Sequence, residues 1–385
     1  MNNSNKVLYR ILLIFLCIFI IGIGFFCKYY SHEQWQSTQI KSLNENLQEL
    51  KIQLVESSEK LVSLEEQREI SNYKLSKLLS FYQKLSVGVD VSILIVGDSI
   101  SNQEWPNWLV SYLENTYDVS VNLKNISMSG NSSYAGYVRL MTLDYKEDIL
   151  TDYDLIIFCY GQNDDIDNFG QYYEGMIRAA RLKYPHASMV SVLESSQKEY
   201  TEKMQIIQEL SKHYEILIAD TIEPFMNGNF GTYDILTIDG VHPSAAGAQI
   251  YADTIGTIID QEVKIQKGDI AVTTPVYKGV EKFDNFVWFG VEQFRREQNT
   301  FILEFNESIS GTLALYYSYI PGKNACQIYI DNVKTIECEF DWPYDFSQSH
   351  IVEMADTCTV LSSLKISFEN ETEADGFYGV CFNWE

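Results

Sequence analysis

Basic residues are scarce in this sequence of 385 residues. Its 28 lysines and arginines face 53 aspartates and glutamates, which leaves a formal net charge of −25 at pH 7. A chain of that charge is repelled by phosphate backbones and anionic lipid surfaces, so we expect no nucleic-acid partner. Hydrophobic residues make up 46% of the chain, which argues against disorder, and the length predicts two folded domains with accessory segments.

No small-residue cleavage site follows the apolar run at residues 11–27. A cleaved signal peptide needs such a site, whereas an uncleaved anchor does not, and the run is long enough to span a bilayer as a helix. Lys6 and Arg10 precede the run and an acidic chain follows it. We therefore expect a single-pass protein of the cell membrane, with residues 1–30 as cytoplasmic N-terminus and membrane anchor and the rest outside the cell.

Proline and glycine are both absent from residues 31–86. Apolar residues recur there at alternating spacings of three and four, with interruptions at Ser57, Arg68 and Ser71. Such a repeat predicts a coiled-coil stalk over residues 31–86 that joins copies of the chain into a homo-oligomer. The polar centre of the repeat leaves a second interpretation open, in which one long helix folds back on the globular part of the chain.

The cysteine spacings match no zinc-binding pattern, and we expect neither a metal nor a cofactor. Three cysteines lie in or beside predicted buried segments and are interpreted as packing residues: Cys17, Cys27 and Cys159. The other four lie near the C-terminal end: Cys326, Cys338, Cys358 and Cys381. Outside the cell these four can form disulfides, and all three ways of pairing them stay open.

Short apolar runs alternate with amphipathic stretches between residues 87 and 265. The predicted strands are residues 91–96, 119–126, 154–160, 188–193 and 216–220. The predicted helices are residues 105–115, 171–183, 202–213 and 244–259. This alternation predicts a parallel sheet with helices on both faces, which is a three-layer α/β/α domain. Residues 270–385 contain short aromatic-rich runs between turn residues, which predict a small all-β sandwich domain.

Chemically active side chains follow the predicted strands. Ser99 ends a G-D-S segment after the first strand, Gly130 lies in S-G-N after the second, and Asn163 lies in G-Q-N-D after the third. Asp239 and His242 belong to a D-G-V-H-P segment before the last predicted helix. The carboxyl ends of parallel strands lie at one edge of the sheet, where ligands bind, so we expect these residues to lie close together.

The four segments, in this order, resemble those of the SGNH (GDSL-like) hydrolase family over residues 92–259, which implies a flavodoxin-like parallel sheet. The resemblance implies that Ser99 is the nucleophile of an ester hydrolase. A serine hydroxyl needs a hydrogen-bonded base at neutral pH, which His242 can supply through one ring nitrogen. Asp239, three residues earlier, can accept a hydrogen bond from the other ring nitrogen and thereby complete a catalytic triad.

The resemblance also assigns an oxyanion hole, the group of donors that stabilises the negative oxygen of the tetrahedral intermediate. Its donors are the backbone N–H groups of Ser99 and Gly130 and the side-chain amide of Asn163. Glycine suits position 130 because a side chain there would hinder the approach of substrate. Asp98 and Asp164 are interpreted as residues that stabilise the turns around these groups, in a supporting shell behind the reacting atoms.

The expected substrate is an acylated carbohydrate, most simply an O-acetylated cell-surface or extracellular polysaccharide from which the enzyme removes acetyl or similar short acyl groups. An acetyltransferase with the same triad and a membrane partner is the alternative, and a non-catalytic surface scaffold is a third. Trp288, Trp342 and Trp384 of the predicted β domain can stack on sugar rings, which would make that domain carbohydrate-binding, or can belong to its core.

Overall fold

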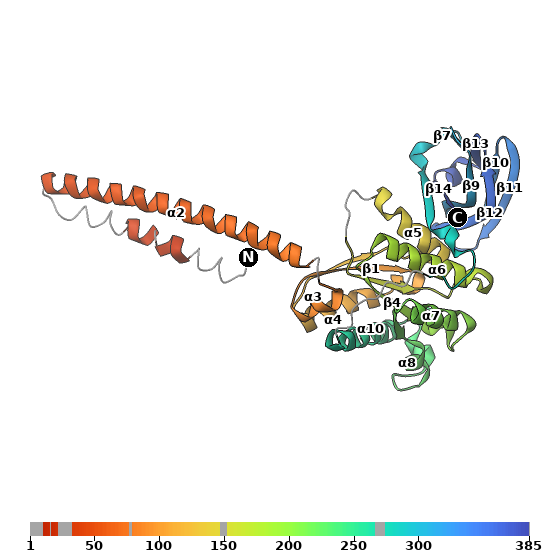
Figure 1. Cartoon of the computed structure of the whole chain (residues 1–385), viewed down its shortest axis with the longest axis horizontal. Coiled ribbons are helices and arrows are strands. Elements are labelled where there is room, and N and C mark those ends of the chain that lie inside the picture. The colour runs from red at the N-terminus through yellow and green to blue at the C-terminus, as the bar shows by residue number, and fades with distance from the viewer. Residues whose placement is uncertain are drawn as a thin grey trace. The chain divides into compact units, whose positions relative to one another are not determined.

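The computed structural model describes residues 11–15, 17–21, 33–76, 79–146, 152–265 and 274–384. The chain divides into two units, Met1–Leu75 and Ser76–Glu385 (Figure 1). The second unit contains a parallel α/β part, followed by an all-β part that we call the β region.

One long helix, α2 (Glu33–Ser76), dominates the first unit. The absence of proline and glycine accounts for its uninterrupted course. Several leucines of the predicted repeat are exposed on it: Leu43, Leu50, Leu54, Leu61 and Leu64. The structure contains one chain, so the coiled coil stays a prediction.

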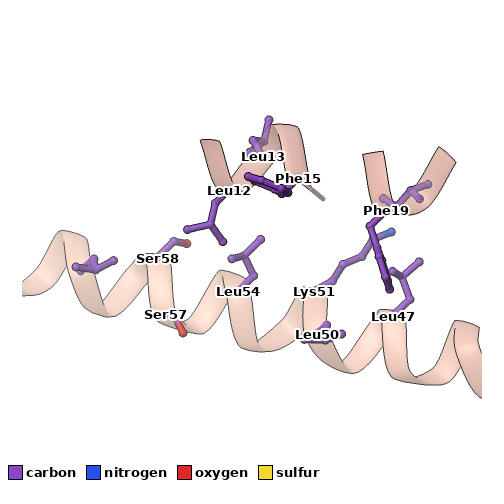
Figure 2. Close-up of a pocket in the computed structure, with 12 residues that line it drawn as sticks. Leu12, Leu13, Phe15, Phe19, Leu47, Leu50, Lys51, Leu54, Ser57 and Ser58 are labelled. Atoms are coloured by element: carbon purple, nitrogen blue, oxygen red, sulfur yellow. The ribbon is translucent and has the colours of Figure 1, made fainter. Parts of the chain in front are cut away.

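Two short helical segments, residues 11–15 and 17–21, fall within the predicted membrane span. Apolar side chains from these segments and from α2 line a hollow that Figure 2 shows, among them Leu12, Phe15, Phe19, Leu47, Leu50 and Leu54. Within the described ranges, no helix combines the length and apolar character needed to cross a membrane. Residues 16 and 22–27 of the predicted span lie outside those ranges, and the anchor stays a prediction.

A five-stranded parallel sheet forms the centre of the α/β part, as predicted. Its strands are β1 (Val91–Gly97), β2 (Val121–Asn125), β3 (Leu155–Cys159), β4 (Ser188–Leu193) and β5 (Leu217–Asp220). All neighbouring strands are parallel, and their order is β2-β1-β3-β4-β5. The order reverses direction at β1, so the crevice between the loops after β1 and its neighbours is where this topology places a ligand.

Helices cover both faces of the sheet. One face carries α5 (Ser133–Lys146), α6 (Ile166–Lys183) and α7 (Glu202–His213), and their buried side chains form one hydrophobic cluster with the sheet. The other face carries α3 (Phe81–Ser86), α4 (Trp105–Tyr117) and α10 (Ala245–Ile265), which form a second cluster. The short helices α8 (Ile222–Met226) and α9 (Tyr233–Leu236) precede α10. The three-layer α/β/α arrangement is therefore present.

Helix α5 lies in a stretch for which the sequence predicted no helix. Residues such as Tyr134, Tyr137 and Val138 are buried on several sides of it, because α5 packs between the sheet and the β region. A helix buried on several sides lacks the polar stripe that makes a surface helix recognisable from its periodicity.

The stalk predicted over residues 31–86 differs from the structure at its C-terminal end. Helix α2 ends at Ser76, and α3 begins separately after Ser80, whose hydroxyl accepts a hydrogen bond from the Gln83 N–H in a capping box. Tyr82 and Leu85, which continued the apolar repeat, are buried in the cluster that α3, α4 and α10 form with the sheet. Their apolar character reflects packing in the globular unit.

The β region contains two antiparallel sheets. One has the order β12-β9-β14-β6 and the other β11-β10-β13-β8-β7. The strands are β6 (Asn285–Gly290), β7 (Arg295–Glu297), β8 (Thr300–Glu304), β9 (Ile309–Tyr319), β10 (Gly322–Ile330), β11 (Val333–Trp342), β12 (Gln348–Val360), β13 (Ser363–Phe368) and β14 (Phe377–Trp384). Both sheets contribute to one buried cluster, including Leu313 and Phe382 from one and Ile328 and Ile366 from the other.

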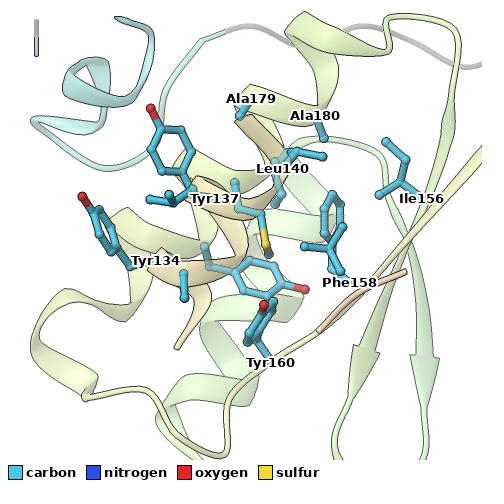
Figure 3. Close-up of a cluster of buried hydrophobic side chains, with 14 of the residues drawn as sticks. Tyr134, Tyr137, Leu140, Ile156, Phe158, Tyr160, Ala179 and Ala180 are labelled. Atoms are coloured by element: carbon cyan, nitrogen blue, oxygen red, sulfur yellow. The ribbon is translucent and has the colours of Figure 1, made fainter. Parts of the chain in front are cut away.

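The β region packs against α5 and α6, so the two parts share buried surface. Tyr134 and Tyr137 of α5, shown in Figure 3, lie in a cluster that also contains side chains of β6, β9, β12 and β14. The Tyr134 hydroxyl donates to Asn383 Oδ1 at 3.0 Å, and the Tyr137 hydroxyl donates to the Phe283 carbonyl at 3.1 Å. This packing brings the first residues of β12 to the loop after β2.

The six cysteines among the described residues are free thiols. Cys326 and Cys338 lie directly opposite each other across the β10–β11 ladder. Cys358 belongs to the core between the two sheets, whereas Cys381 faces the cluster shared with α5. Of the three pairings left open by the sequence, the strand register favours the one containing Cys326 with Cys338.

Candidate active site

Ser99 lies at the carboxyl end of β1, at the first residue of a 3-10 turn, Ser99–Asn102. The strand is continuous and buried from Ile93 to Val96, which fixes the point where the turn begins. Asp98 caps this turn, because its Oδ1 accepts a hydrogen bond from the Ile100 N–H at 2.9 Å. A Cβ atom on Gly97 would lie 2.3 Å from the Ser101 Oγ, so the tight turn requires glycine before Asp98.

His242 and Asp239 reach Ser99 from the loop before α10. A bridge between Thr237 and Pro243 closes the loop, and the Ile238 N–H donates to the His242 carbonyl at 2.8 Å. His242 Nε2 lies 2.8 Å from Ser99 Oγ, and His242 Nδ1 lies 2.7 Å from Asp239 Oδ2. The structure thus brings together the three residues that the sequence predicted as a triad, in the order that a serine nucleophile, its base and an orienting carboxylate require.

Asp239 is held by its own loop as well as by the imidazole ring. Its Oδ1 accepts hydrogen bonds from the N–H groups of Val241 and His242, at 3.0 and 2.8 Å. Partial desolvation alone would raise the pKa of this carboxyl, but the hydrogen bonds from His242 and Val241 outweigh it and lower the pKa to about 2. The carboxylate therefore stays ionised under ordinary conditions and can fix the tautomer of His242.

Gly130 lies in the loop Ser129–Asn131, which we call the oxyanion loop. Its φ of +68° is in the left-handed region, where a residue with a Cβ would be strained. Two hydrogen bonds join the loop to the segment around Ser99. The Met128 N–H donates to the Gly97 carbonyl at 2.9 Å, and Asn102 Nδ2 donates to Ser129 Oγ at 3.0 Å. The second predicted oxyanion residue thus follows β2 next to the turn that carries Ser99.

Asn163 follows β3 and bonds to both neighbouring segments. Its Nδ2 donates to Asp98 Oδ2 at 3.1 Å and, more weakly, to the Asn131 carbonyl at 3.4 Å. The amide therefore lies between the turn of Ser99 and the oxyanion loop. An incoming oxyanion would take one of these two hydrogen bonds.

Asp98 and Asp164 are buried carboxyl groups behind the site. Burial raises the pKa of Asp98 to about 7; the Ile100 N–H opposes the rise and the nearby Asp164 adds to it. Burial also raises the pKa of Asp164 to about 6, although its Oδ1 accepts hydrogen bonds from the N–H and hydroxyl of Ser133 at 2.8 and 2.6 Å. Asp98 holds the Ser99 turn and Asn163, and Asp164 holds the start of α5, so their contacts match the turn-stabilising interpretation.

Two residues at the site received no role from the sequence. Asn131, at the end of the oxyanion loop, is buried and bonds to β12. Gln348, the first residue of β12, donates through Nε2 to the Ser129 carbonyl. Asn131 adjoins the predicted Gly130 and could have been noticed for that reason, whereas nothing near Gln348 in the sequence indicates a contact 219 positions away.

Aromatic side chains gather beside the segment that leads into β12. Phe340, Tyr344 and Phe346 are 38%, 53% and 51% exposed, and the Tyr344 and Phe346 rings are stacked with centroids 5.4 Å apart. We call these three residues the aromatic patch. Of the tryptophans considered for sugar stacking, Trp288 and Trp342 are buried and Trp384 is exposed at the end of β14.

Part of the chain is similar to a known protein family. Residues 95–250 match the sequence profile of the GDSL-like Lipase/Acylhydrolase family. A comparison with curated proteins gives no match.

Among solved structures, a two-domain esterase (CEX) active on acetylated mannans, co-crystallised with mannopentaose, is 17% identical with a TM-score of 0.62; the match covers 81% of this chain and 95% of that one. The same esterase without mannopentaose matches at 16% identity with a TM-score of 0.60, over 81% of this chain and 95% of that one. A lipase/acylhydrolase from Enterococcus faecalis is 20% identical, with a TM-score of 0.35, over 47% of this chain and 100% of its own. The match to the two-domain structures covers 81% of this chain and so extends beyond the α/β part into the β region. The combination of α/β part and β region is therefore a shared fold.

Proposed function

We propose that this chain, whose residues 95–250 form an SGNH (GDSL-type) esterase domain, removes O-acetyl or similar short acyl groups from a polysaccharide through a serine acyl-enzyme. The observation that carries the proposal is the hydrogen-bonded series from Asp239 through His242 to Ser99, with contacts of 2.7 and 2.8 Å. Ser99 is half-buried at the end of β1 and is positioned for attack on a bound ester.

The proposed reaction has two acyl-transfer steps. In the first, Ser99 Oγ attacks the ester carbonyl carbon while His242 Nε2 takes the hydroxyl proton, and collapse of the tetrahedral intermediate breaks the bond to the sugar oxygen, which leaves with that proton. In the second, water attacks the acyl-enzyme, His242 takes its proton, and the carboxylic acid leaves as Ser99 regains a hydrogen. Asp239 stabilises the imidazolium in both steps and stays ionised.

The developing oxyanion would be held by the Ser99 and Gly130 N–H groups and by the Asn163 amide. The hydrogen bonds that hold these groups before substrate binds reduce the reorganisation needed during the reaction. Loss of one such donor typically lowers kcat by roughly 100- to 1000-fold.

A glycan ester is the proposed substrate class for two reasons. The two-domain esterase with the same combined fold is active on acetylated mannans. In this chain the aromatic patch of Phe340, Tyr344 and Phe346 lies beside the start of β12, which contacts the oxyanion loop. Exposed aromatic rings offer flat apolar faces to pyranose rings.

The proposed location is the outer face of the cell membrane. An N-terminal span at residues 11–27 would anchor the chain, and α2, with its exposed leucine repeat, would pair with copies of itself as a stalk. A tethered esterase of this kind acts on glycan at or near the cell surface.

The test compares the wild-type chain with Ser99→Ala on p-nitrophenyl acetate and on acetylated mannan, with released acetate measured directly. Ser111→Ala is the matched control, because Ser111 is an exposed serine of α4 that bonds only within its helix. We expect turnover by wild type and Ser111→Ala and none by Ser99→Ala.

Acetate found on an added acceptor sugar instead of in water would establish an acetyltransferase. Absence of turnover in the wild type on both substrates would contradict catalysis and favour a scaffold.

A further inference from the structure

We propose that the first residues of β12, Gln348–Ile351, position the oxyanion loop for catalysis, so that the β region completes the active site of the α/β part. This inference rests on the proposed function. Gln348 is the central positioning residue, and it acts through the backbone of the oxyanion loop.

The contact begins with the peptide group that joins Ser129 to Gly130. Gln348 Nε2 donates to the Ser129 carbonyl, and Asn131 Nδ2 donates to the same oxygen at 2.8 Å. In a planar trans peptide the C=O and the following N–H point in opposite directions. Two donors on the Ser129 oxygen therefore fix the direction of the Gly130 N–H, which is the proposed oxyanion donor.

Hydrogen bonding at the carbonyl also strengthens the donor on the other side of the same peptide. A carbonyl that accepts hydrogen bonds polarises its amide group, and serial hydrogen bonds reinforce one another. Gln348 thus contributes to both the direction and the strength of the Gly130 N–H.

Asn131 fastens the far end of the loop to β12. Its Nδ2 donates to the Ser349 carbonyl at 3.0 Å, and its Oδ1 accepts from the Ile351 N–H at 3.0 Å. Because Asn131 is buried, these contacts are shielded from competing water. The Asn131 carbonyl also accepts the 3.4 Å hydrogen bond from Asn163. The contacts between Asn131 and β12 therefore also position the proposed side-chain oxyanion donor.

Strand β12, which makes these contacts, is held by its pairing with β9 and by aromatic neighbours. Gln348 and His350 are in register with Tyr319 and Tyr317 of β9. The His350 ring lies 4.3 Å from that of Tyr319 and 5.1 Å from that of Trp342, measured between centroids. A Cβ on Gly130 would lie 2.7 Å from Gln348 Nε2 and 3.4 Å from His350 Cε1, so β12 approaches to van der Waals distance of the loop.

The experiment replaces Gln348 in the full chain with Met, Glu or Lys. Met keeps similar bulk without a donor, and Glu places an acceptor against the Ser129 carbonyl. Lys retains a donor. The readouts are kcat and KM on p-nitrophenyl acetate, a substrate too small to need contacts with the aromatic patch, together with the thermal midpoint. Gln205→Met is the matched control. Gln205 is an exposed residue of α7 and also donates through Nε2 to a backbone carbonyl, that of Tyr200.

We expect Gln348→Met to lower kcat by roughly 10- to 100-fold with little change in KM, because misplacement of a catalytic group costs rate and leaves substrate binding intact. Gln348→Glu should lose at least as much, Gln348→Lys should recover much of the rate, and Gln205→Met should match the wild type. Wild-type kcat in both Gln348→Met and Gln348→Glu would overturn the inference and leave the proposed esterase intact.

Three further outcomes also decide the question. A rate loss in Gln348→Lys equal to that in Gln348→Met would overturn the role of a donor. If Gln348→Met does not fold, the comparison of Gln348→Glu with Gln348→Lys decides, since these differ in acceptor and donor at one position. An inactive wild type contradicts the proposed function itself.

Discussion

The two carboxylate oxygens of Asp239 have different partners, and together they hold the carboxylate against His242. One carboxylate oxygen accepts hydrogen bonds from two backbone N–H groups of its own loop, and the other accepts one from the imidazole Nδ1–H. The backbone contacts set the orientation of the carboxylate before the ring engages it. This local arrangement needs only the three-residue spacing between Asp239 and His242.

Asp239→Asn tests that orientation. An asparagine can donate from its amide to Nδ1 and so favour the tautomer that protonates Nε2, which cannot then accept the Ser99 proton. We expect kcat to fall by on the order of a thousandfold or more with KM little changed. Asp234→Asn, at an exposed position of α9, should keep full activity in the same assay. Similar kcat values for the two variants would show that Asp239 is not part of the triad.

Asp98 makes stability depend on pH. Burial raises its pKa from 3.8 to about 7, so between about pH 4 and pH 7 the folded chain holds a proton that the unfolded chain releases. The contribution of this group to the free energy of unfolding therefore falls as pH rises through that window, by at most ~1.4 kcal/mol per pH unit.

Asp98→Asn should remove this contribution. Urea unfolding at pH 5 and pH 7 is the measurement, and the decrease in the free energy of unfolding between them should be smaller in the variant than in the wild type. The exposed Asp118→Asn should retain the wild-type difference. An unchanged difference in Asp98→Asn would mean that Asp98 titrates normally in the folded chain.

At the scale of elements, the β10–β11 hairpin places Cys326 and Cys338 opposite each other. The Cys326 thiol donates a hydrogen bond to the Cys338 sulfur, which outweighs the effect of burial and lowers the pKa of Cys338 to about 7. The lowered pKa favours the thiolate form of Cys338, which is the form that enters disulfide exchange. Cys358 and Cys381 lie in different buried clusters and lack such a partner across a ladder.

Mild oxidation with diamide should therefore join Cys326 to Cys338 and leave Cys358 and Cys381 reduced. Peptide mapping by mass spectrometry without reduction identifies the pair. Cys338→Ser should yield no intramolecular disulfide under the same treatment. A bridge from Cys326 or Cys338 to Cys358 or Cys381, without a Cys326–Cys338 bridge, would contradict the register of β10 and β11.

At the scale of the whole molecule, the division after Leu75 separates the proposed anchor and stalk from the part that carries chemistry. Each group of the site described above belongs to Ser76–Glu385. The β region belongs to this unit because it shares a buried cluster with α5 and α6 and supplies Gln348 to the oxyanion loop.

Removal of residues 1–75 should leave kcat and KM on p-nitrophenyl acetate within about twofold of the full chain, because the removed residues belong to the first unit and every group of the site belongs to the second. The full chain should sediment with membranes and need detergent for release, whereas the shortened chain should stay in the supernatant. A large loss of activity would show that the first unit supports the site. A full chain in the supernatant would contradict the proposed anchor.

The shortened chain should also run as a smaller assembly than the detergent-solubilised full chain when mass is measured by light scattering, if α2 associates through its leucines. Equal stoichiometry for both would assign any oligomer to the second unit.

The α/β/α fold and the grouping of Ser99, Gly130, Asn163, Asp239 and His242 at one edge of the sheet could be predicted from the sequence alone. Strand and helix periodicities are local, and each of these residues follows a strand or precedes a helix at a spacing that short-range hydrogen bonds require, as between Asp239 and the N–H of His242.

The surroundings of these residues depend on long-range packing and could not be predicted from the sequence. Helix α5 was not predicted because both the sheet and the β region bury it, so it lacks a polar stripe. Tyr82 and Leu85 belong to the globular core although they continue the apolar repeat of the stalk. Gln348 reaches Ser129 across 219 positions, through the register of β12 on β9 and the packing of the β region on α5. No periodicity or motif encodes such a contact, because it depends on how the α/β part and the β region pack against each other.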